Sequence, residues 1–318
     1  MSGNRPHLFD ELEDRIGRDH LATRLRLQVN HSAKYFGRGF GSFHWENSHL
    51  LPQVLEFLLK ASGLLGVGKQ NVLDFEVVEI DVMLEDLPEA LEGYCLLQLS
   101  DIHIDGMPDG GERLIRIIRT LRYDACVMTG DYRFHTFGNY KNALDGMKRL
   151  AAAIECPDGI YGILGNHDFV EMVPALESCG IRMLLNEAVR IARGDAAIHL
   201  LGLDDAHFYG VAVIEKAIRD LPADGLKVLL VHSPELIPQA AEAGVSYYLC
   251  GHTHGGQICL PGRIPLLTNA SCTREYVGGV WHYQHMAGYT SRGTGSSCLP
   301  VRFFCPPEIT LHRLIRLR

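Results

Sequence analysis

The stretch YCLLQLSDIH, residues 94–103, joins a short apolar run to two polar residues, Asp101 and His103. A continuous apolar run of this length favours a strand that is buried on both faces. Four later apolar runs (125–128, 160–164, 228–231 and 247–250) precede, in order, Asp131, Asn166, His232, and the pair His252 and His254. Because ligands bind beyond the carboxyl ends of strands in α/β sheets, the five runs predict one site at one sheet edge.

Other segments fit an α/β protein. Phe75–Met83 alternates apolar and acidic residues and predicts a strand, as does Ala197–Leu203, whereas Gly111–Arg122 gathers its apolar residues on one helical face. The C-terminal run Glu308–Leu317 predicts a further strand that closes a sheet edge. Alternating strands and helices, with antiparallel hairpins late in the chain, predict the α/β class.

Residues 1–74 lack this alternation and predict an N-terminal helical extension to a domain that spans residues 75–318. Within the extension, the segment Leu8–Ile16 repeats apolar residues at helical spacing and predicts a short amphipathic helix. His44 and Trp45 follow in a glycine- and aromatic-rich stretch. They could cover the site or simply pack on the domain.

The segment Leu50–Val67 is apolar enough to raise the question of a membrane. Polar or helix-breaking residues interrupt it at Pro52, Gln53, Glu56 and Lys60. Since a spanning helix needs about 20 consecutive apolar residues, we expect no transmembrane helix. Two interpretations remain: an amphipathic helix packed on the domain, or a surface that enters a bilayer or accepts an acyl chain.

Composition narrows the classes of partner and compartment. Thirty basic and 38 acidic residues give a formal charge of −8, which disfavours a nucleic-acid partner because binding needs a basic surface. A small phosphorylated substrate, acylated or not, stays compatible, since metal ions supply positive charge locally. The nine cysteines form no CxxC pair, and the N-terminus has no secretory signal or twin arginine. We therefore expect a cytoplasmic protein, either free or peripheral on the inner membrane face.

The residue types at the strand ends suit a pair of metal ions. Residues i and i+2 of an extended segment point the same way, so Asp101 and His103 can hold one ion together. The carboxylate of Asp131 can bridge two ions, and the two histidines of GHTH can reach separate ions about 3.5–4 Å apart. Mixed imidazole, carboxylate and amide ligands suit Mn most, with Fe or Zn as alternatives, rather than Ca or Mg.

Residues beside these ligands are candidates for catalysis and substrate binding. His167 could protonate a leaving oxygen, with Asp168 orienting it. Arg133, His135 and Arg292 could contact a substrate phosphate, although loop solvation for the first two and a glycine-rich turn for Arg292 are the favoured interpretations. For Asp204 and Asp205, which end a strand, turn formation and capping are the expected roles.

The ordered series DIH, GD, GNHD, a lone histidine and GHTH resembles the calcineurin-like metallophosphoesterase superfamily over roughly residues 92–257. The resemblance implies a four-layer αββα sandwich of two mixed sheets, with the metal site at the carboxyl ends of the strands. It also implies that His167 is catalytic and that Asp168 is its partner. The implied ligands of one metal are Asp101, His103, Asp131 and His254, and those of the other are Asp131, Asn166, His232 and His252.

The C-terminal stretch GYTSRGTGSSCLPVRFFCPPEITLHRL further resembles a bacterial subfamily of predicted phosphodiesterases. That subfamily has exported and membrane-anchored members, and UDP-diacylglucosamine hydrolases are close to it. Two departures narrow the match. Phe134 stands where purple acid phosphatases carry tyrosine, and the signal or anchor of exported relatives has no counterpart here.

These features favour a dinuclear metal-dependent hydrolase of phosphodiester or pyrophosphate bonds, acting on a lipid-linked or nucleotide-sugar-linked substrate such as UDP-diacylglucosamine. A soluble phosphodiesterase for cyclic nucleotides or other small diesters is the alternative, because it would use the same metal ligands. A non-catalytic scaffold with the same fold is disfavoured, since such a protein would have no need of seven intact ligands and His167.

Overall fold

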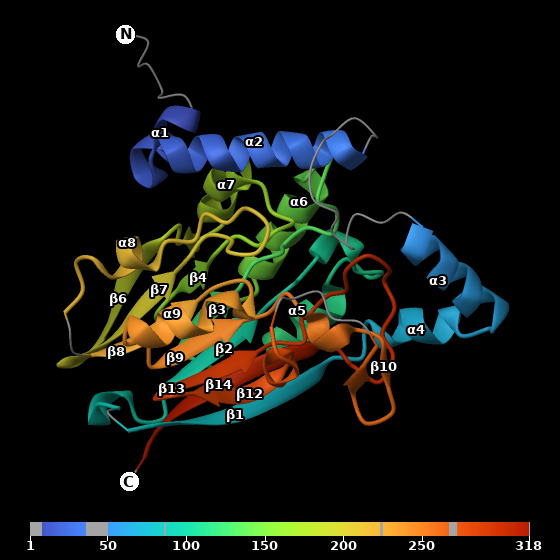
Figure 1. The fold of residues 1–318 in the computed structure, drawn as a ribbon. Coiled ribbons are helices and arrows are strands. Elements are labelled where there is room, and N and C mark those ends of the chain that lie inside the picture. Colours follow the sequence, from blue (N-terminus) through green and yellow to red (C-terminus); the bar gives the residue numbers. More distant parts are fainter. Residues whose placement is uncertain (1–7, 36–49, 86, 223–224, 267–271, 318) are drawn as a thin grey trace.

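The computed structural model describes residues 8–35, 50–85, 87–222, 225–266 and 272–317, and His44 and Trp45 lie outside these ranges. Two six-stranded sheets pack face to face with helices on both outer sides, which makes the predicted four-layer αββα sandwich (Figure 1). The first sheet has the order β1 (Glu76–Leu84), β14 (Glu308–Arg316), β2 (Cys95–Leu99), β3 (Ala125–Met128), β4 (Ile160–Gly162) and β5 (Ile181–Met183). The second has the order β12 (Gly279–Tyr283), β13 (Met286–Thr290), β9 (Tyr247–Cys250), β8 (Leu226–Leu230), β7 (Ala196–Gly202) and β6 (Glu187–Arg193).

Both sheets are mixed. In the first sheet, β14 runs parallel to β1 and antiparallel to β2, and the strands from β2 to β5 are all parallel. In the second, β13, β9, β8 and β7 are parallel, and antiparallel strands β12 and β6 close its two ends. The prediction that residues 308–317 close a sheet edge is wrong. β14 lies inside the sheet with both faces buried over residues 308–312, and β1 forms the edge.

Three apolar clusters define the layers. The first joins the outer face of the first sheet to α5 (Glu112–Ile118), α6 (Lys141–Ala151) and α7 (Val173–Ser178). The second fills the space between the sheets. The third joins the outer face of the second sheet to α8 (Ile214–Ile218) and α9 (Ile237–Glu242).

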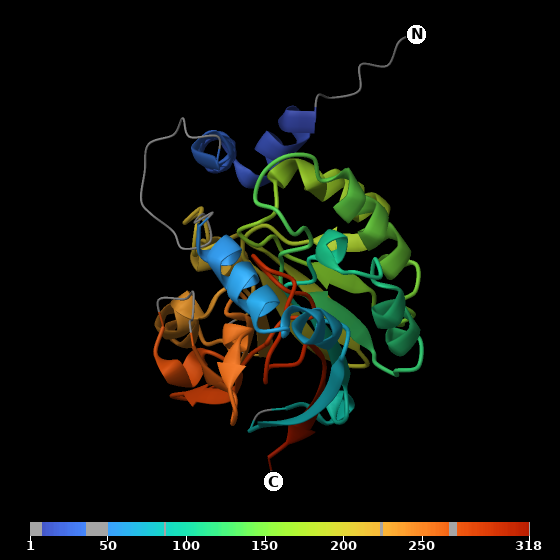
Figure 2. The same cartoon turned by 90° about the vertical axis from the view of Figure 1, so that its right-hand side faces the viewer.

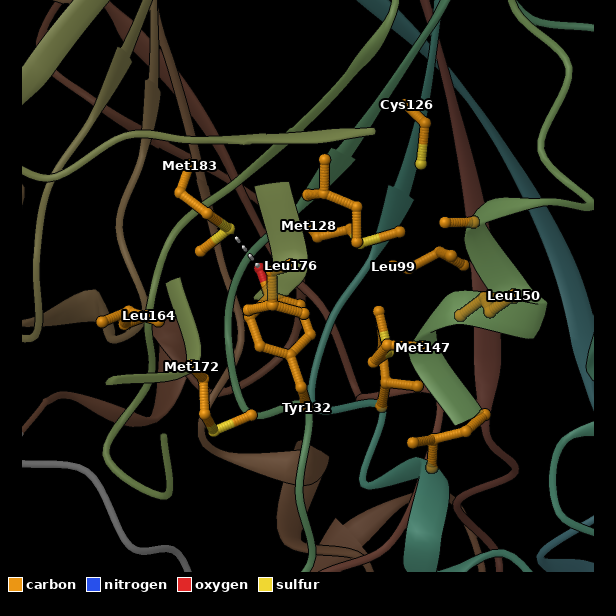
Figure 3. Packing of buried hydrophobic residues seen from close by; sticks show 14 of the residues in the cluster. Leu99, Cys126, Met128, Tyr132, Met147, Leu150, Leu164, Met172, Leu176 and Met183 are labelled. Atoms are coloured by element: carbon orange, nitrogen blue, oxygen red, sulfur yellow. Dashed lines mark hydrogen bonds between the residues drawn. The ribbon is translucent and has the colours of Figure 1, made fainter. Parts of the chain in front are cut away.

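The first cluster anchors the chain next to Asp131. Tyr132 is fully buried, and its hydroxyl donates to the carbonyl of Ile163 at 2.8 Å and faces Met183 Sδ at 4.0 Å. Figure 3 shows its ring among methionine and leucine side chains from several elements. Because methionine fills irregular gaps well, this packing fixes the backbone that carries Asp131.

Over its described residues, 8–35 and 50–74, the N-terminal segment has four helices: α1 (Leu8–Ile16), α2 (Arg18–Tyr35), α3 (Leu50–Ala61) and α4 (Leu65–Asn71). Apolar residues of α1 and α2 join the first cluster, whereas α3 and α4 project from one side of the molecule (Figure 1). None of the helices in the described part of the chain is both long and apolar enough to cross a membrane. We propose residues 1–74 as an extension of the domain at 75–318.

Candidate metal centre

The loops after the strands hold their polar residues in an unusual backbone conformation. Asp101, His103, Asp131, His252 and His254 all have positive φ values, between 43° and 67°. This left-handed region costs a non-glycine residue about 1–3 kcal/mol, and such strain persists where surrounding structure imposes it, most often at functional sites. These five strained residues follow β2 and β3 of the first sheet and β9 of the second. They therefore mark the neighbouring strand ends of both sheets as the candidate site, rather than the edge of one sheet that the sequence predicted.

Glycines in the motifs GNHD and GHTH allow these loops to approach one another. A Cβ atom at Gly165 would collide with Oδ1 of Asp131, and one at Gly251 would collide with Ser100 Oγ and Asp101 Oδ2. Close approach without a side chain is the physical reason for glycine at both positions. The backbone N–H of His252 uses this approach to donate to the Asp101 carboxylate at 3.0 Å.

Side-chain atoms of the first predicted group converge. Nε2 of His254 lies 3.3 Å from Nε2 of His103 and 3.5 Å from Oδ1 of Asp101. Oδ2 of Asp131 lies 3.8 Å from Nε2 of His103. All four side chains are buried, so their electron pairs face a space of low polarity.

The second group converges in the same way. Oδ1 of Asn166 lies 2.9 Å from Nε2 of His232 and 3.1 Å from Nδ1 of His252. Nε2 of His232 is also 3.3 Å from Oδ2 of Asp131. Asp131 thus belongs to both groups, and the structure brings all seven predicted ligand residues together.

Hydrogen bonds behind the rings decide which nitrogen faces the site. Nδ1 of His103 lies 2.7 Å from the carbonyl of Arg133, and Nδ1 of His232 lies 2.7 Å from the carbonyl of Thr129. A carbonyl accepts only, so each Nδ1 carries the proton and, in a neutral ring, Nε2 keeps its lone pair. Lone pairs that face carboxylate and amide oxygens repel unless a cation or proton lies between them. The donor set therefore fits divalent metal ions.

Charges in the site are strongly coupled. Burial alone would raise the pKa of Asp131, but His232 and His167 hold it well below its usual range. Burial alone would lower the pKa of His232, but Asp131 raises it well above its usual value. The pKa of His254 lies well below its usual value because of burial and the neighbouring His103. The lowered pKa keeps His254 in the neutral form that binds metals, whereas the raised pKa favours a charged His232 ring as long as Asp131 and no cation lies beside it.

His167 lies beside these groups with one nitrogen facing the site. Its Nδ1 lies 2.7 Å from the carbonyl of Phe134, and its Nε2 lies 3.8 Å from Oδ2 of Asp131. Burial lowers the pKa of His167 to about 3. The neutral ring therefore presents Nε2 toward the Asp131 carboxylate.

Asp168 does not orient His167 in the way expected from the sequence. Its carboxylate accepts backbone N–H groups from Gly165 at 2.9 Å, from Asp131 at 2.8 Å and from Tyr132 at 2.9 Å. Burial, with a contribution from Asp131, raises the pKa of Asp168 to about 6. The correction is that Asp168 ties two ligand loops together, while the carbonyl of Phe134 holds the His167 ring.

The three residues expected to touch substrate lie in different surroundings. The guanidinium of Arg133 is buried over the ring of Phe169, 4.4 Å from its centroid, and donates to backbone carbonyls of its own loop. Arg292 pairs with Glu308 at 2.6 Å and with Glu76 at 2.9 Å. This internal ion-pair network replaces the substrate contact expected for Arg292. His135 is exposed beside two phenylalanine rings.

Sequence reasoning missed Arg302. It is fully buried, and its guanidinium donates to the carbonyls of Gly295 at 3.0 Å through Nε, Cys305 at 3.0 Å through Nη1, and Arg292 at 2.7 Å through Nη2. These bonds hold the glycine-rich loop against the site, where a Cβ at Gly293 would lie 3.0 Å from Nδ1 of His254. Arg302 does not directly follow a strand, since β13 ends at Thr290, so the strand-end pattern that revealed the ligands could not reveal it.

A histidine–carboxylate pair on the other side was also missed. Nδ1 of His207 lies 2.7 Å from Oε1 of Glu235, and its ring centroid lies 4.2 Å from that of His252. The preceding Asp205 accepts backbone N–H groups from residues 207–209, so its predicted capping role is confirmed. The loop after β7 therefore supports the ring of a predicted ligand.

The N-terminal extension also reaches this region. Arg24 of α2 is fully buried, with Nη2 2.8 Å from Oδ1 of Asp204. The guanidinium lies over the ring of Tyr209 and, through Nη1, contacts the carbonyl of Asp168 at 3.4 Å. Asp204 is thus a buried ion-pair partner as well as a strand-end residue.

Comparison with known proteins gives a consistent assignment. The family model described as calcineurin-like phosphoesterase matches residues 96–256. The uncharacterized metallophosphoesterase YkoQ of Bacillus subtilis is 28% identical over 81% of this chain and 94% of its own length. Phosphodiesterase YaeI of Escherichia coli is 29% identical over 60% of this chain and 70% of its own length. A zebrafish (Danio rerio) transmembrane protein with metallophosphoesterase domain is 29% identical over 82% of this chain and 61% of its own length.

Proposed function

Since the chain belongs to the calcineurin-like phosphoesterase family and is a metal-dependent phosphoesterase, we propose that it uses two divalent cations to cleave a phosphodiester or pyrophosphate bond. The observation that carries this proposal is the shared position of Asp131. Its Oδ2 lies near Nε2 of His103 in one group and near Nε2 of His232 in the other. A single carboxylate between two sets of lone pairs supports a dinuclear centre.

We propose Asp101, His103, Asp131 and His254 as ligands of one cation, and Asp131, Asn166, His232 and His252 as ligands of the other. When bound, the cations would polarise phosphoryl oxygens and lower the pKa of water at the site. Mn is the proposed metal, with Fe or Zn as alternatives, because imidazole, carboxylate and amide donors are mixed.

The proposed catalytic residue outside the ligand sets is His167. The carbonyl of Phe134 fixes its Nδ1 proton, so the lone pair of Nε2 is the site that can take up a proton and pass it to a leaving oxygen. Asp168 acts through the backbone by holding the loops of Asp131 and His167 in place. His135 remains a proposed substrate contact because its exposed ring directly follows Phe134, whose carbonyl holds His167.

For the substrate, we propose a lipid-linked or nucleotide-sugar-linked compound such as UDP-diacylglucosamine. The exposed apolar side chains of residues 50–67 support this choice, because they could meet acyl chains or the membrane that holds them. The chain would then work in the cytoplasm, on the inner membrane face. A soluble cyclic-nucleotide or small-diester phosphodiesterase is the alternative, and YaeI carries the name phosphodiesterase.

The test is a substrate comparison with the purified full chain in Mn²⁺. Hydrolysis of bis-p-nitrophenyl phosphate that is lost with chelator and restored by Mn²⁺ would support the metal-dependent diesterase. Turnover is then compared between UDP-diacylglucosamine and cyclic nucleotides. Preference for the acylated compound supports the lipid proposal, whereas preference for cyclic nucleotides selects the alternative.

A further inference from the structure

An apolar surface lies on the side of the molecule where α3 and α4 project. On α3, Val54, Phe57 and Leu58 are exposed, and the Phe57 side chain is 69% exposed. Leu64 and Val67, at the start of α4, are exposed as well. Single exposed apolar residues are ordinary, but several on adjoining helices indicate an interaction site.

A second segment, distant in sequence, extends this surface. The hairpin of β10 (Cys259–Leu260) and β11 (Ile264–Pro265) exposes Leu260, Ile264 and the following Leu266. Figure 2 shows the helices and the hairpin on the same side of the molecule. Together with Phe304, which is 58% exposed, these residues form what we call the apolar platform. Its members are Val54, Phe57, Leu58, Leu64, Val67, Leu260, Ile264, Leu266 and Phe304.

The segment around Phe304 joins the two halves of the platform. The backbone N–H of Arg302 donates to the carbonyl of Gly68 in α4 at 3.0 Å. On the other side, the N–H of Cys259 donates to the carbonyl of Phe303 at 2.9 Å. A Cβ at Gly68 would collide with the Phe303 ring, so α4 and this segment are in close contact. The platform is therefore built on one connected unit.

The same segment reaches the metal centre. Sγ of Cys305 lies 3.3 Å from the carbonyl of His254, and the guanidinium of Arg302 lies behind the His254 ring. Cys305 directly follows Phe304 in the chain, and one residue separates Arg302 from Phe304. The platform is thus continuous with the wall of the site that Asp101, His103 and His254 form.

Charge on the platform helices differs from that of the whole chain. Acidic residues outnumber basic residues by 38 to 30 overall, but α3 and α4 carry Lys60 and Lys69 against Glu56 alone. A basic residue near an anionic bilayer is attracted to its surface. Transfer of a Leu or Phe side chain from water into the bilayer is also favourable. Apolar and basic residues side by side match an anionic lipid surface.

We propose that the apolar platform docks on an anionic lipid bilayer and so presents the phosphate of a membrane-held, acylated substrate to the metal centre. The docking surface therefore includes the exposed residues of the β10–β11 hairpin and Phe304 as well as the platform residues of α3 and α4. Presentation of an acylated substrate rests on the proposed function, whereas docking on the bilayer can be measured without catalysis.

The test is sedimentation of the full chain with phosphatidylglycerol-rich vesicles and with pure phosphatidylcholine vesicles. Two double variants remove parts of the platform: Phe57→Gln with Leu58→Gln, and Ile264→Thr with Leu266→Thr. The matched control is Val29→Gln, which changes a 67% exposed apolar residue on α2, away from the platform. Circular dichroism and thermal melting check that each variant folds.

We expect the unmodified chain to prefer the anionic vesicles, each double variant to bind them at least tenfold more weakly, and the control to bind normally. The ratio of turnover on a vesicle-held substrate to turnover on its short-chain soluble analogue should fall at least tenfold in the double variants. Equal vesicle binding by all variants, or no binding by the unmodified chain, would overturn the docking proposal. It would also be overturned if light scattering showed that the unmodified chain self-associates and the double variants do not, because the platform would then bind a second copy of the chain. Vesicle binding without any hydrolysis would overturn the proposed function and leave docking intact.

Discussion

Nη2 of Arg302 lies 3.4 Å from Nδ1 of His254, so a fully buried guanidinium sits directly behind a predicted metal-ligand ring. Nη2 has shorter contacts with the carbonyls of Gly295, Arg292 and Gly293, at 2.5, 2.7 and 3.1 Å. We therefore interpret the contact with His254 as packing that fixes the ring plane. Arg302 acts on the site by positioning a ligand and a loop.

Replacing Arg302 with Lys should weaken metal binding although the charge is kept. A lysine ammonium cannot reach the carbonyls on both sides at once, and each buried group left unpaired costs about 1–3 kcal/mol. Calorimetric titration with Mn²⁺ should show weaker binding at one of two sites, together with a lower melting temperature. Unchanged Mn²⁺ affinity at both sites would show that Arg302 does not position a metal ligand.

Asp131→Asn should abolish binding of both ions and nearly all hydrolysis. One side chain contributes to both ligand groups, and an amide in its place brings one oxygen fewer and no charge. Elemental analysis of the purified variant measures this directly. Asp81→Asn is the control, because that carboxylate is exposed in an ion pair with Arg313 and such pairs contribute about 0–1 kcal/mol. A variant at 131 that keeps two ions would show that Asp131 is not the bridge.

His167→Ala should keep both ions and lose rate by roughly 10²–10⁴-fold, the usual effect of losing a general acid or base. The ring nitrogen that faces the site is 3.8 Å from Asp131, and the other is held by the carbonyl of Phe134. Metal content and kcat are measured on the same preparation. Loss of metal along with rate would instead make His167 a ligand.

Strand-end residues were predictable because they depend on local pattern. An apolar run and the polar residue after it are adjacent in sequence, and the topology of parallel strands brings such ends together. Asp101, His103 and Asp131 follow neighbouring parallel strands of the first sheet and therefore needed no knowledge of the tertiary structure. His252 follows β9 of the second sheet, and only the packing of the two sheets brings it to them. The same reasoning correctly expected a turn-capping carboxylate at Asp205.

Roles that depend on distant contacts were not predictable in this way. Arg24 and Asp204 are 180 positions apart, and Arg302 and His254 are 48 apart, so no periodicity links them. Asp168 follows His167 directly, which suggested a side-chain pair, yet three backbone N–H groups compete for its carboxylate and bind it. β14 was placed at an edge because alternation in a sequence does not say how many neighbours a strand has.

Asp204 should make the docking of α2 sensitive to acid. Burial alone would raise the pKa of Asp204, but Arg24 and then His20 lower it below its usual value. The pKa of Asp204 is therefore lower in the folded state than in the unfolded state, where an aspartate has a pKa of about 3.9. At pH values above about 3.9 the ionised carboxylate stabilises the fold, and this stabilisation is lost as pH falls through the folded-state pKa.

Asp204→Asn should therefore destabilise the protein at neutral pH, by about 3–5 kcal/mol, because the buried Arg24 loses its charge partner. The difference in melting temperature from the unmodified chain should shrink as pH approaches 3. Adding Arg24→Met to Asp204→Asn should recover part of the loss. A constant difference at every pH would contradict the ion pair as its cause.

Gly165→Ala should disable the metal centre without touching any ligand side chain. The added Cβ would collide with Oδ1 of Asp131 and lie 2.6 Å from its backbone nitrogen, so Asp131 must move. Gly66→Ala is the matched control, because a Cβ there meets nothing within 4 Å and alanine favours the helix by about 1 kcal/mol. Mn²⁺ titration and diester hydrolysis should both fail at position 165 and be normal at position 66. Normal metal binding by Gly165→Ala would mean that the close approach of these two loops does not set the position of the bridging carboxylate.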